Sequence, residues 1–519
     1  MNKPDSVDQS HASSSDSGIV RKHIRGSSLL FLGRIIALLI NFVTQVLIVR
    51  YLSKNDFGAF AYAVSVVSMG SSLGLLGLHK AVHRFVPIYQ EREDWPAMVG
   101  TIVLVLGSTV VLGLAIIALT FGLSGFLQEN VVSNPRSVGL LLILITLVPL
   151  QGFDTIFQGM CAVFASPRAI FFRRHILGPL LKLAAIVTVL ITEGSVESLA
   201  TGYLVAGIVG VVAYVFLLKR VMRSSAMPKR EGPLKLRVPF REVYAYCLPL
   251  LTTDFLLVLK TELVIIVLES FRGTSEVAEF QAVFPVAALN LLIMQSLRFL
   301  YTPFASRLFA RQDTAGIRQL YSQTTAWITI VTFPIFAMCV FLSEPITETL
   351  FGTRYSDAST LLTILAVGFY FNSAMGFNVY TLNVYARVGF VSAVNTVVAM
   401  LALVLYFTLI PRYGALGAAI STTTAMIVQN VLNQYGLVKR TEVGHFSGAH
   451  GRVYVAVALV GSILLAVRMI TSSVWIILPL IVISGLGLIR WSRDLLAIAE
   501  TFPELTRVPG SRFILGRSA

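Results

Sequence analysis

The sequence has little charge. Asp, Glu, Lys and Arg make up 13% of its 519 residues, whereas a soluble domain usually carries about 25%. Cysteine is scarce as well: Cys161, Cys247 and Cys339 are the whole set, and neither CxxC nor HExxH occurs. Because no metal-ligand spacing is present, we expect no metal site and no cofactor. We interpret the three cysteines as small apolar packing residues.

What the sequence does contain is apolar residues, which account for 55% of it. This composition excludes a soluble fold and predicts an integral membrane protein. The net charge of +15 would suit a nucleic-acid binder only if the basic residues formed one face or one tail. They lie between the apolar runs instead, where they orient a protein in the membrane, so we expect no nucleic-acid partner.

Apolar runs of about 20 residues, the length of one membrane crossing, recur along the chain. They predict an all-α polytopic membrane protein with about fourteen transmembrane helices. A Ser-rich polar segment at 1–25 precedes them and predicts a disordered cytoplasmic tail. The predicted spans are 27–49, 57–78, 98–122, 139–163, 176–192, 198–218, 246–268, 277–298, 321–343, 358–380, 388–410, 414–437, 453–470 and 474–490.

Basic residues are distributed unevenly about these spans. With the N-terminus inside, 31 Lys and Arg residues fall in the tails, in the inner loops or at the inner end of a span, 6 fall in the outer loops and 4 lie deeper within spans. By the positive-inside rule, this bias predicts that both termini are cytoplasmic. The predicted parts are an N-lobe, a basic cytoplasmic loop, a C-lobe, a final pair of spans and a cytoplasmic tail, at 26–218, 219–245, 246–437, 453–490 and 491–519.

The two lobes resemble each other weakly in sequence. RYLSKNDFGAFAYAV follows the first span as SFRGTSEVAEFQAVF follows the seventh, and Pro87 and Pro303 take matching places after the next span of each lobe. A parallel duplication is one way in which transporters build a central site. Coincidence among apolar sequences is the alternative, and we favour duplication.

Several spans carry polar side chains on one face. Lipid cannot satisfy such stripes, so they should face a hydrated cavity or one another. In the first span, Asn41 and Gln45 lie within about 20° of Arg34 on the helical wheel. The other stripes are Gln151, Asp154, Thr155 and Gln158 in the fourth span, and Gln281, Gln295 and Arg298 in the eighth.

The seventh span, 246–268, holds three ionisable residues: Asp254, Lys260 and Glu262. Asp254 and Lys260 are about 120° apart on the wheel, and Lys260 and Glu262 about 160°. Helical partners sit three or four residues apart, so neither acid can pair with Lys260 along this helix. The partners must come from other spans, from a ligand or from water, and we expect the three charges to line a cavity.

Snorkelling to the membrane surface is the alternative for the other cations. Arg34 lies about 10 Å from the inner end of its span, at 1.5 Å per residue, and could reach the surface. Lys182 and Arg298 lie closer still to the inner face, and for them we favour snorkelling; Arg468 should reach the outer surface. Lys260 is too deep to escape and is the strongest functional candidate.

Two passages carry a family resemblance. The first, 33–89, contains RYLSKNDFG (50–58), a Gly/Leu-rich run ending at Leu78, and RFVP (84–87). The second, 386–425, contains IPRYGALGAA (410–419) at the junction of two spans. Both resemble the Wzx-type O-antigen and polysaccharide flippases of the multidrug/oligosaccharidyl-lipid/polysaccharide (MOP) exporter superfamily. Together with the span count, the similarity covers most of residues 20–440.

The resemblance implies two six-helix bundles around a central cavity, with two extra C-terminal helices. It also implies a task, which is to move a polyprenyl-diphosphate-linked oligosaccharide across the cytoplasmic membrane for surface polysaccharide. A polymerase and glycosyltransferases of that pathway would be its partners, along with membrane lipid. Cations would attract the diphosphate, polar side chains the sugars, and acids would bind H⁺ or Na⁺. The substrate candidates are Lys260, Arg34, Asn41, Gln45 and Arg298, and the ion-coupling candidates are Asp154, Asp254 and Glu262.

Other functions remain open at this point. Lipid II flippases place an arginine shortly before the Phe-Pro of the eighth span, but EFQAV precedes Phe284–Pro285 here, which weakens a lipid II substrate. A cation-coupled multidrug exporter would hold a mainly acidic, aromatic cavity. A polysaccharide polymerase or ligase would need catalytic residues in a large outer loop, and the outer loops 123–138 and 344–357 are short. We therefore expect a transporter, not an enzyme.

Overall fold

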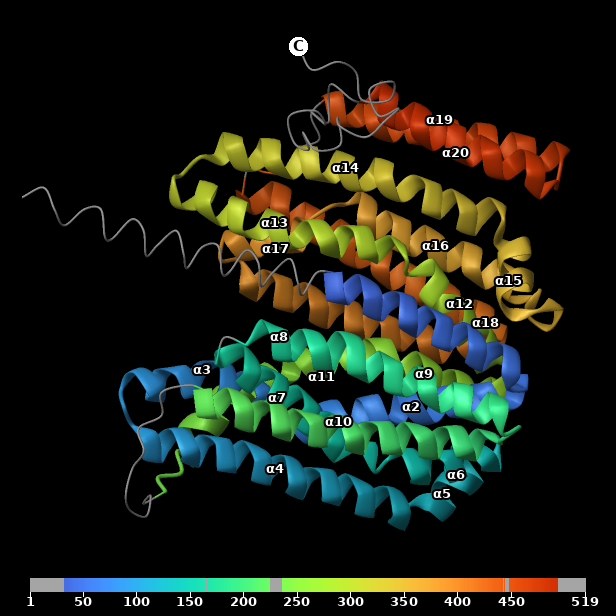
Figure 1. The fold of residues 1–519 in the computed structure, drawn as a ribbon. Helices are drawn as coiled ribbons and strands as arrows, with labels where there is room; N and C mark the ends of the chain where they lie inside the picture. Colours follow the sequence, from blue (N-terminus) through green and yellow to red (C-terminus); the bar gives the residue numbers. More distant parts are fainter. Residues whose placement is uncertain (1–31, 165, 225–235, 442, 444–447, 493–519) are drawn as a thin grey trace, which may run out of the picture. The chain divides into compact units, whose positions relative to one another are not determined.

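The computed structural model of the protein describes residues 32–164, 166–224, 236–441, 443 and 448–492 (Figure 1). Within these residues every regular element is a helix, which confirms the all-α prediction. The predicted tail 1–25, most of the tail 491–519 and residues 225–235 of the basic loop lie outside the described residues.

The first half of the chain contributes eleven helical segments among the described residues. A helix at Leu32–Tyr51 is followed by α2 (Lys54–Leu75), α3 (Leu78–Glu91), α4 (Trp95–Gly122), α5 (Ser124–Asn130), α6 (Pro135–Leu144), α7 (Leu147–Val163), α8 (Pro167–Ile170), the π-helix η1 (Phe171–Leu177), α9 (Gly178–Ile191) and α10 (Val196–Ser224).

The second half contains α11 (Phe240–Arg272), α12 (Thr274–Ala287), α13 (Asn290–Ala310), α14 (Thr314–Phe341), α15 (Ser343–Phe351), the 3₁₀ turn η2 (Thr353–Tyr355), α16 (Ala358–Ala374), α17 (Asn378–Val384), α18 (Val388–Thr441), α19 (Gly448–Ile470) and α20 (Val474–Trp491). α18 is two helices that meet at a kink, where Gly414 has φ 58° and ψ −134°.

All fourteen predicted spans overlap helices of the structure. By length and composition, ten described helices can cross a membrane, or twelve if each bent pair is one span. Two predicted spans, 388–410 and 414–437, fall within α18, and 246–268 falls within α11, which is not among the ten. The protein is therefore a multi-pass membrane protein, and the count of fourteen stays a prediction.

Two long helices begin in the same way in the two halves of the chain. Asp94 caps α4 by accepting a hydrogen bond from the Ala97 amide at 3.1 Å. Asp313 caps α14 by accepting one from the Gly316 amide at 2.7 Å. Such caps satisfy amides that the first helical turn leaves unpaired. Both helices are 28 residues long, and each is followed by a short helix, α5 or α15.

The broken spans also recur at corresponding positions. The second and eighth predicted spans break between α2 and α3 and between α12 and α13, and the latter pair is bent by 46°. The fourth and tenth break between α6 and α7, which are bent by 42°, and between α16 and α17. This element-by-element correspondence supports the predicted duplication, because coincidental similarity of apolar sequence would not reproduce the positions of the breaks.

The chain forms two compact units. Unit 1 comprises the described residues among 1–52, 63–131 and 135–258. Unit 2 comprises those among 53–62, 132–134 and 259–519, so that α11 begins in unit 1 and ends in unit 2. Cys161 and Cys247 are buried in the main core of unit 1. Cys339 is buried in unit 2. The three cysteines therefore pack as small apolar residues, as predicted.

The core of unit 2 has two parts. One joins α14 to α19 and α20, which run side by side (Figure 1). The other joins α13, α14, α17 and α18 around Tyr301, Tyr321 and Phe377. Tyr321 donates a hydrogen bond to Gln434 Oε1 at 2.7 Å, so its buried hydroxyl is satisfied. These helices support the polar cavity of unit 2 described below.

Candidate functional site

A cavity of about 380 Å³ lies within unit 1, among the first helix, α2, α6, α7, η1, α9 and α10. Its apolar wall comes from residues such as Leu147 and Ala206. Its polar wall gathers residues that lie far apart in the sequence: Asn41, Gln151, Asp154, Thr155, Arg173, Arg174, Lys182 and Tyr203. Asn41 and the fourth-span stripe were predicted to face such a space.

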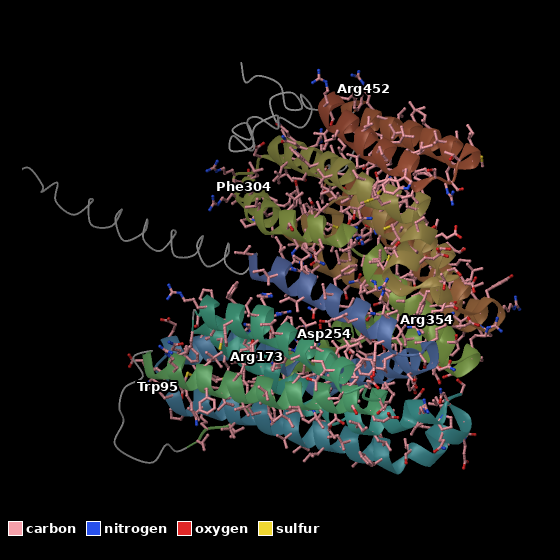
Figure 2. The ribbon with its side chains drawn as sticks, turned by 45° about the vertical axis from the view of Figure 1, so that its right-hand side comes forward. Trp95, Arg173, Asp254, Phe304, Arg354 and Arg452 are labelled. Carbon is pink, nitrogen blue, oxygen red and sulfur yellow. The ribbon has the colours of Figure 1, made fainter. Side chains whose placement is uncertain are left out.

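Arg173 is the fixed cation of this cavity (Figure 2). It is 7% exposed, its Nε donates to the Gly210 carbonyl at 2.9 Å, and its Nη2 donates to Asp154 Oδ1. Its guanidinium carbon also lies 5.1 Å from the centre of the Tyr214 ring. A buried guanidinium needs this full set of partners, and the half-buried Asp154 gains a cation as its partner. The pair is therefore mutually positioned.

Arg174 and Lys182 supply two further positive charges. Both side chains are exposed and line the cavity, with the Lys182 amine 5.6 Å from the centre of the Tyr203 ring. We expected Lys182 to snorkel to the inner surface, and the structure places it on the cavity wall. Against one carboxylate, Asp154, the wall carries three cations, so the cavity is net positive.

The π-helix η1 carries two adjacent arginines that differ in burial. Phe171–Leu177 winds more widely than an α-helix, a geometry that recurs at functional sites. Arg173 is buried and Arg174 is exposed. The first helix packs on this segment at Gly33, where a Cβ would lie 2.6 Å from the Phe171 ring. That contact places Arg34 beside η1. Of the three polar residues predicted on the first helix, however, Asn41 is among the described residues that line the cavity, and Arg34 and Gln45 are not.

Asp254 belongs to another polar cluster of unit 1. The Lys80 amine of α3 lies 2.8 Å from Asp254 Oδ1, and His79 Nε2 lies 3.9 Å from Oδ2. Asp254 (labelled in Figure 2), a predicted ion-coupling residue, therefore forms an ion pair with a lysine from another helix. This confirms the prediction that its partner comes from outside its own helix.

Lys260 lies in unit 2 against α18. Its amine donates to Gln429 Oε1 at 2.5 Å, and its carbonyl accepts a hydrogen bond from the Tyr406 hydroxyl at 2.8 Å. Gln429 in turn donates to Asn395 Oδ1 at 2.9 Å. The partner comes from another span, which is one of the three sources that the sequence left open. Glu262 is half-buried two residues further along α11.

A second cavity, of about 260 Å³, lies within unit 2. Gln295 and Arg298 of the predicted eighth-span stripe both line it. Arg298 donates to the Tyr380 hydroxyl at 2.9 Å, so this side chain, which we expected to snorkel, is turned onto the cavity wall. Among the described residues, no cluster of His, Cys, Asp or Glu could hold a metal ion.

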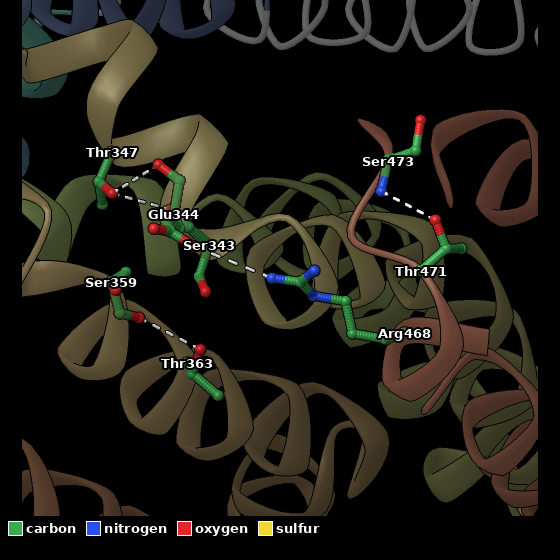
Figure 3. A network of polar contacts seen from close by, with 8 residues as sticks. All are labelled: Ser343, Glu344, Thr347, Ser359, Thr363, Arg468, Thr471 and Ser473. Carbon is green, nitrogen blue, oxygen red and sulfur yellow. Dashed lines mark hydrogen bonds and ion pairs between the residues drawn. The ribbon is translucent and has the colours of Figure 1, made fainter. Parts of the chain in front are cut away.

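Arg468 of α19 and residues at the start of α15 form a small polar network (Figure 3). Its guanidinium lies 3.9 Å from Glu344 at the start of α15. Arg468 is 30% and Glu344 59% exposed, so solvent screens this pair and its contribution to stability is small. The network is a surface feature and holds none of the candidate site residues.

Two kinds of functional candidate were missed in the sequence. Arg173 and Arg174 were assigned to the loop before a span starting at 176, whereas the helix runs continuously from Pro167. The FFRRH run next to an apolar segment was the available signal. Lys80 was missed because it directly follows the predicted second span. The available signal was Asp254, because a carboxylate within another predicted span needs a cation as its partner.

Solved structures show which fold the chain has. The lipid II flippase MurJ, in an inward closed conformation, superposes with a TM-score of 0.68 at 15% identity, covering 93% of this chain and 100% of that one. An inward-facing MATE family multidrug resistance transporter of the MOP superfamily superposes with a TM-score of 0.61 at 14% identity, covering 78% and 94%. The chain therefore has the fold of the MOP superfamily transporters.

The particular family follows from the sequence itself. The model of the polysaccharide biosynthesis protein family matches residues 47–360, and the chain belongs to that family. The predicted resemblance to polysaccharide flippases of the MOP superfamily is thereby confirmed.

Three relatives are similar in sequence. An uncharacterized membrane protein of Methanocaldococcus jannaschii is 22% identical over 435 residues, 81% of this chain and 85% of the relative. The capsular polysaccharide biosynthesis protein CapF of Staphylococcus aureus is 24% identical over 39% of this chain and 50% of its own length. The probable low-salt glycan biosynthesis flippase of Haloferax volcanii is 24% identical over 32% of this chain and 35% of its own length.

Proposed function

We propose that the chain carries a polyprenyl-diphosphate-linked oligosaccharide from the inner to the outer leaflet of the cytoplasmic membrane. In this proposal both termini are cytoplasmic, and the carrier serves surface polysaccharide biosynthesis together with glycosyltransferases and a polymerase. The family membership supports the pathway, and the names of two relatives, a capsular polysaccharide biosynthesis protein and a probable glycan biosynthesis flippase, support the task.

The observation that carries the proposal is the positive wall of the unit 1 cavity. Arg173, Arg174 and Lys182 face a diphosphate with three cations, and guanidinium groups bind phosphate oxygens in bidentate fashion. Low-dielectric surroundings strengthen such attraction. We also propose substrate roles for Arg34, Asn41 and Gln45. All three residues lie on the first helix, which borders this cavity through Asn41.

Ion coupling is part of the same proposal. Asp154 and Asp254 each accept a charge-assisted hydrogen bond, from Arg173 and Lys80 respectively. Protonation of either carboxylate would weaken that bond and release a cation toward the substrate, which links proton binding to anion binding. Glu262 remains a third candidate on α11.

A multidrug exporter is the other function that the fold accommodates. A cationic drug would enter a cavity with an excess of positive charge and be repelled by it. The lining of the unit 1 cavity therefore favours an anionic substrate over a cationic one.

The test is transport in cells that lack the chain and are complemented with variants. Arg174→Gln/Lys182→Gln should lower surface glycan about tenfold or more, because two charges that would contact phosphate are lost. Lipid-linked glycan should accumulate inside these cells. Arg168→Gln is the matched control, since Arg168 is exposed in the preceding turn and does not line the cavity. Wild-type surface glycan from a correctly inserted double variant would refute the proposal.

A further inference from the structure

The unit 2 cavity has a wall of side-chain amides drawn from three helices. Asn372 comes from α16, Asn378 from α17, and Gln429, Asn430 and Asn433 from α18. Each amide presents two donors and an acceptor, which is the pairing that a hydroxyl group requires. A wall of this kind suits a ligand rich in hydroxyl groups.

The amides are oriented by one another. Asn430 Nδ2 donates to Asn372 Oδ1 at 2.8 Å, and Asn430 Oδ1 accepts from Asn378 Nδ2 at 3.3 Å. Gln429 is held between the Lys260 amine and Asn395. A network fixed in this way keeps its geometry when the cavity is empty, so a ligand need not order it on binding.

Asn433 is the exception in this wall. Its side chain is 0% exposed, and neither its Oδ1 nor its Nδ2 has a hydrogen-bond partner among the described residues. Buried polar groups are almost always satisfied, and leaving one unpaired is costly. An amide that lines a cavity and has no partner in the protein is therefore positioned for a partner that enters the cavity.

The charge and the volume of the unit 2 cavity restrict the class of ligand further. Among the described lining residues Arg298 is the one charged side chain, and no carboxylate is present, so a metal or drug cation would find no counter-charge. A volume of about 260 Å³ is small beside pockets for drug-sized ligands, which span about 300–1,000 Å³. The cavity suits a group of one or two sugar rings.

We propose that the unit 2 cavity is a carbohydrate subsite, in which Asn433 and the Asn430 network hydrogen-bond the hydroxyl groups of one or two sugar residues. The proposal rests on the proposed function for the source of the sugar, a lipid-linked glycan. It assigns the sugar moiety a site of its own, separate from the cations of the unit 1 cavity.

The test is sugar binding to the full-length protein in lipid nanodiscs. The probe is the pool of saccharides released by mild acid from the lipid-linked fraction of cells lacking the chain, and saturation-transfer NMR follows its titration. Asn433→Leu keeps the number and branching of the side-chain heavy atoms but removes the amide. It should weaken sugar binding about tenfold, as expected for the loss of one or two hydrogen bonds. Because the amide has no partner in the empty protein, the melting temperature without sugar should not fall.

Asn290→Leu is the matched control. Asn290 is also 0% exposed, its amide also has no partner among the described residues, and it does not line the cavity. Its replacement should leave sugar binding unchanged. The proposal is overturned if Asn433→Leu binds like the wild type, if both variants lose binding equally, or if the wild type shows no saturation transfer.

This result is separable from that of the proposed function. If Arg174→Gln/Lys182→Gln transports normally while sugar binding still depends on Asn433, the flippase proposal fails and the carbohydrate subsite stands. If transport depends on the cations but sugar binding does not depend on Asn433, the subsite alone fails.

Discussion

At the scale of single residues, the charges in the membrane helices are held by partners from other helices. Asp254 accepts from Lys80, Asp154 from Arg173, and Lys260 donates to Gln429. The first two are ion pairs. The third is a lysine amine that donates to a neutral amide and not to a carboxylate, and in this respect Lys260 resembles a ligand-binding cation more than a structural one.

Replacements of Lys260 should distinguish the contribution of its charge to transport from the contribution of its hydrogen bonding. Lys260→Arg keeps the charge and should retain much of the transport, whereas Lys260→Gln keeps only hydrogen bonding and should lower surface glycan about tenfold, the effect of roughly 1.4 kcal/mol. Lys260→Ala should likewise insert normally and stop export. Surface glycan is measured in cells that lack the native chain, with membrane insertion checked on the same samples.

Double variants test whether Asp254 or Glu262 forms a buried ion pair with Lys260. Because Asp254 already pairs with Lys80 at 2.8 Å, Lys260→Gln/Asp254→Asn should transport no better than Lys260→Gln. Lys260→Gln/Glu262→Gln should also fail to recover. Recovery in either double variant would identify a buried ion pair and remove Lys260 from the substrate site.

Residue patterns predicted these environments only in part. The wheel angles showed that Lys260 could not pair along its own helix, and Asn41, Asp154, Gln295 and Arg298 do line cavities. The identity of a partner in another helix could not be predicted, because it depends on packing between segments that lie, for Lys80 and Asp254, 174 residues apart. The same limit hid the cavity positions of Arg173 and Arg174.

At the scale of elements, the junction within α18 shows how one sequence motif shapes a turn. Gly414 in IPRYGALGAA has φ 58°, a left-handed conformation that favours glycine. The Glu276 carboxylate of α12 accepts a hydrogen bond from the Ala415 amide at 2.5 Å and is itself 3.3 Å from Arg272 Nε. The second helix therefore starts with its Ala415 amide satisfied by a side chain from α12.

Gly414→Ala should destabilise the protein. Holding a residue other than glycine in this sparsely populated region of positive φ costs about 1–3 kcal/mol, and a Cβ would also collide with the Glu276 carboxylate. Thermal unfolding of the detergent-purified protein measures the effect. Gly389→Ala is the control in the same element, since a Cβ there meets nothing within 4 Å and should be tolerated. Equal melting temperatures for the two variants would contradict the role assigned to Gly414.

Helices were the part of the fold best predicted from the sequence, because apolar runs of membrane length leave few alternatives. Their breaks were not predicted. The interruptions at Leu76–Gly77 and Gly376 use positive φ angles within apolar runs, where hydropathy carries no signal. The short helices α5 and α15 lie in segments that we interpreted as loops, and η1 lies at the predicted boundary between a loop and the fifth span.

At the scale of the whole molecule, the distribution of basic residues predicts how the chain lies in the membrane. The loop 219–245 holds eight Lys and Arg residues, which the positive-inside rule assigns to the cytoplasm. α10 ends at Ser224 within this loop, and α5 carries the exposed Gln128 in a predicted outer loop. The two positions should face opposite sides of the membrane.

Cysteine labelling of intact cells tests this orientation, and the native cysteines favour the experiment. Cys161, Cys247 and Cys339 are all buried, so they should react slowly and leave a low background. Gln128→Cys should react with a membrane-impermeant maleimide added outside, and Ser224→Cys only after the membrane is permeabilised. Reaction of Ser224→Cys from outside would invert the topology. The positive cavity of unit 1 would then have to be re-examined as a site loaded from the opposite leaflet, because a substrate built in the cytoplasm must first meet its carrier at the inner face.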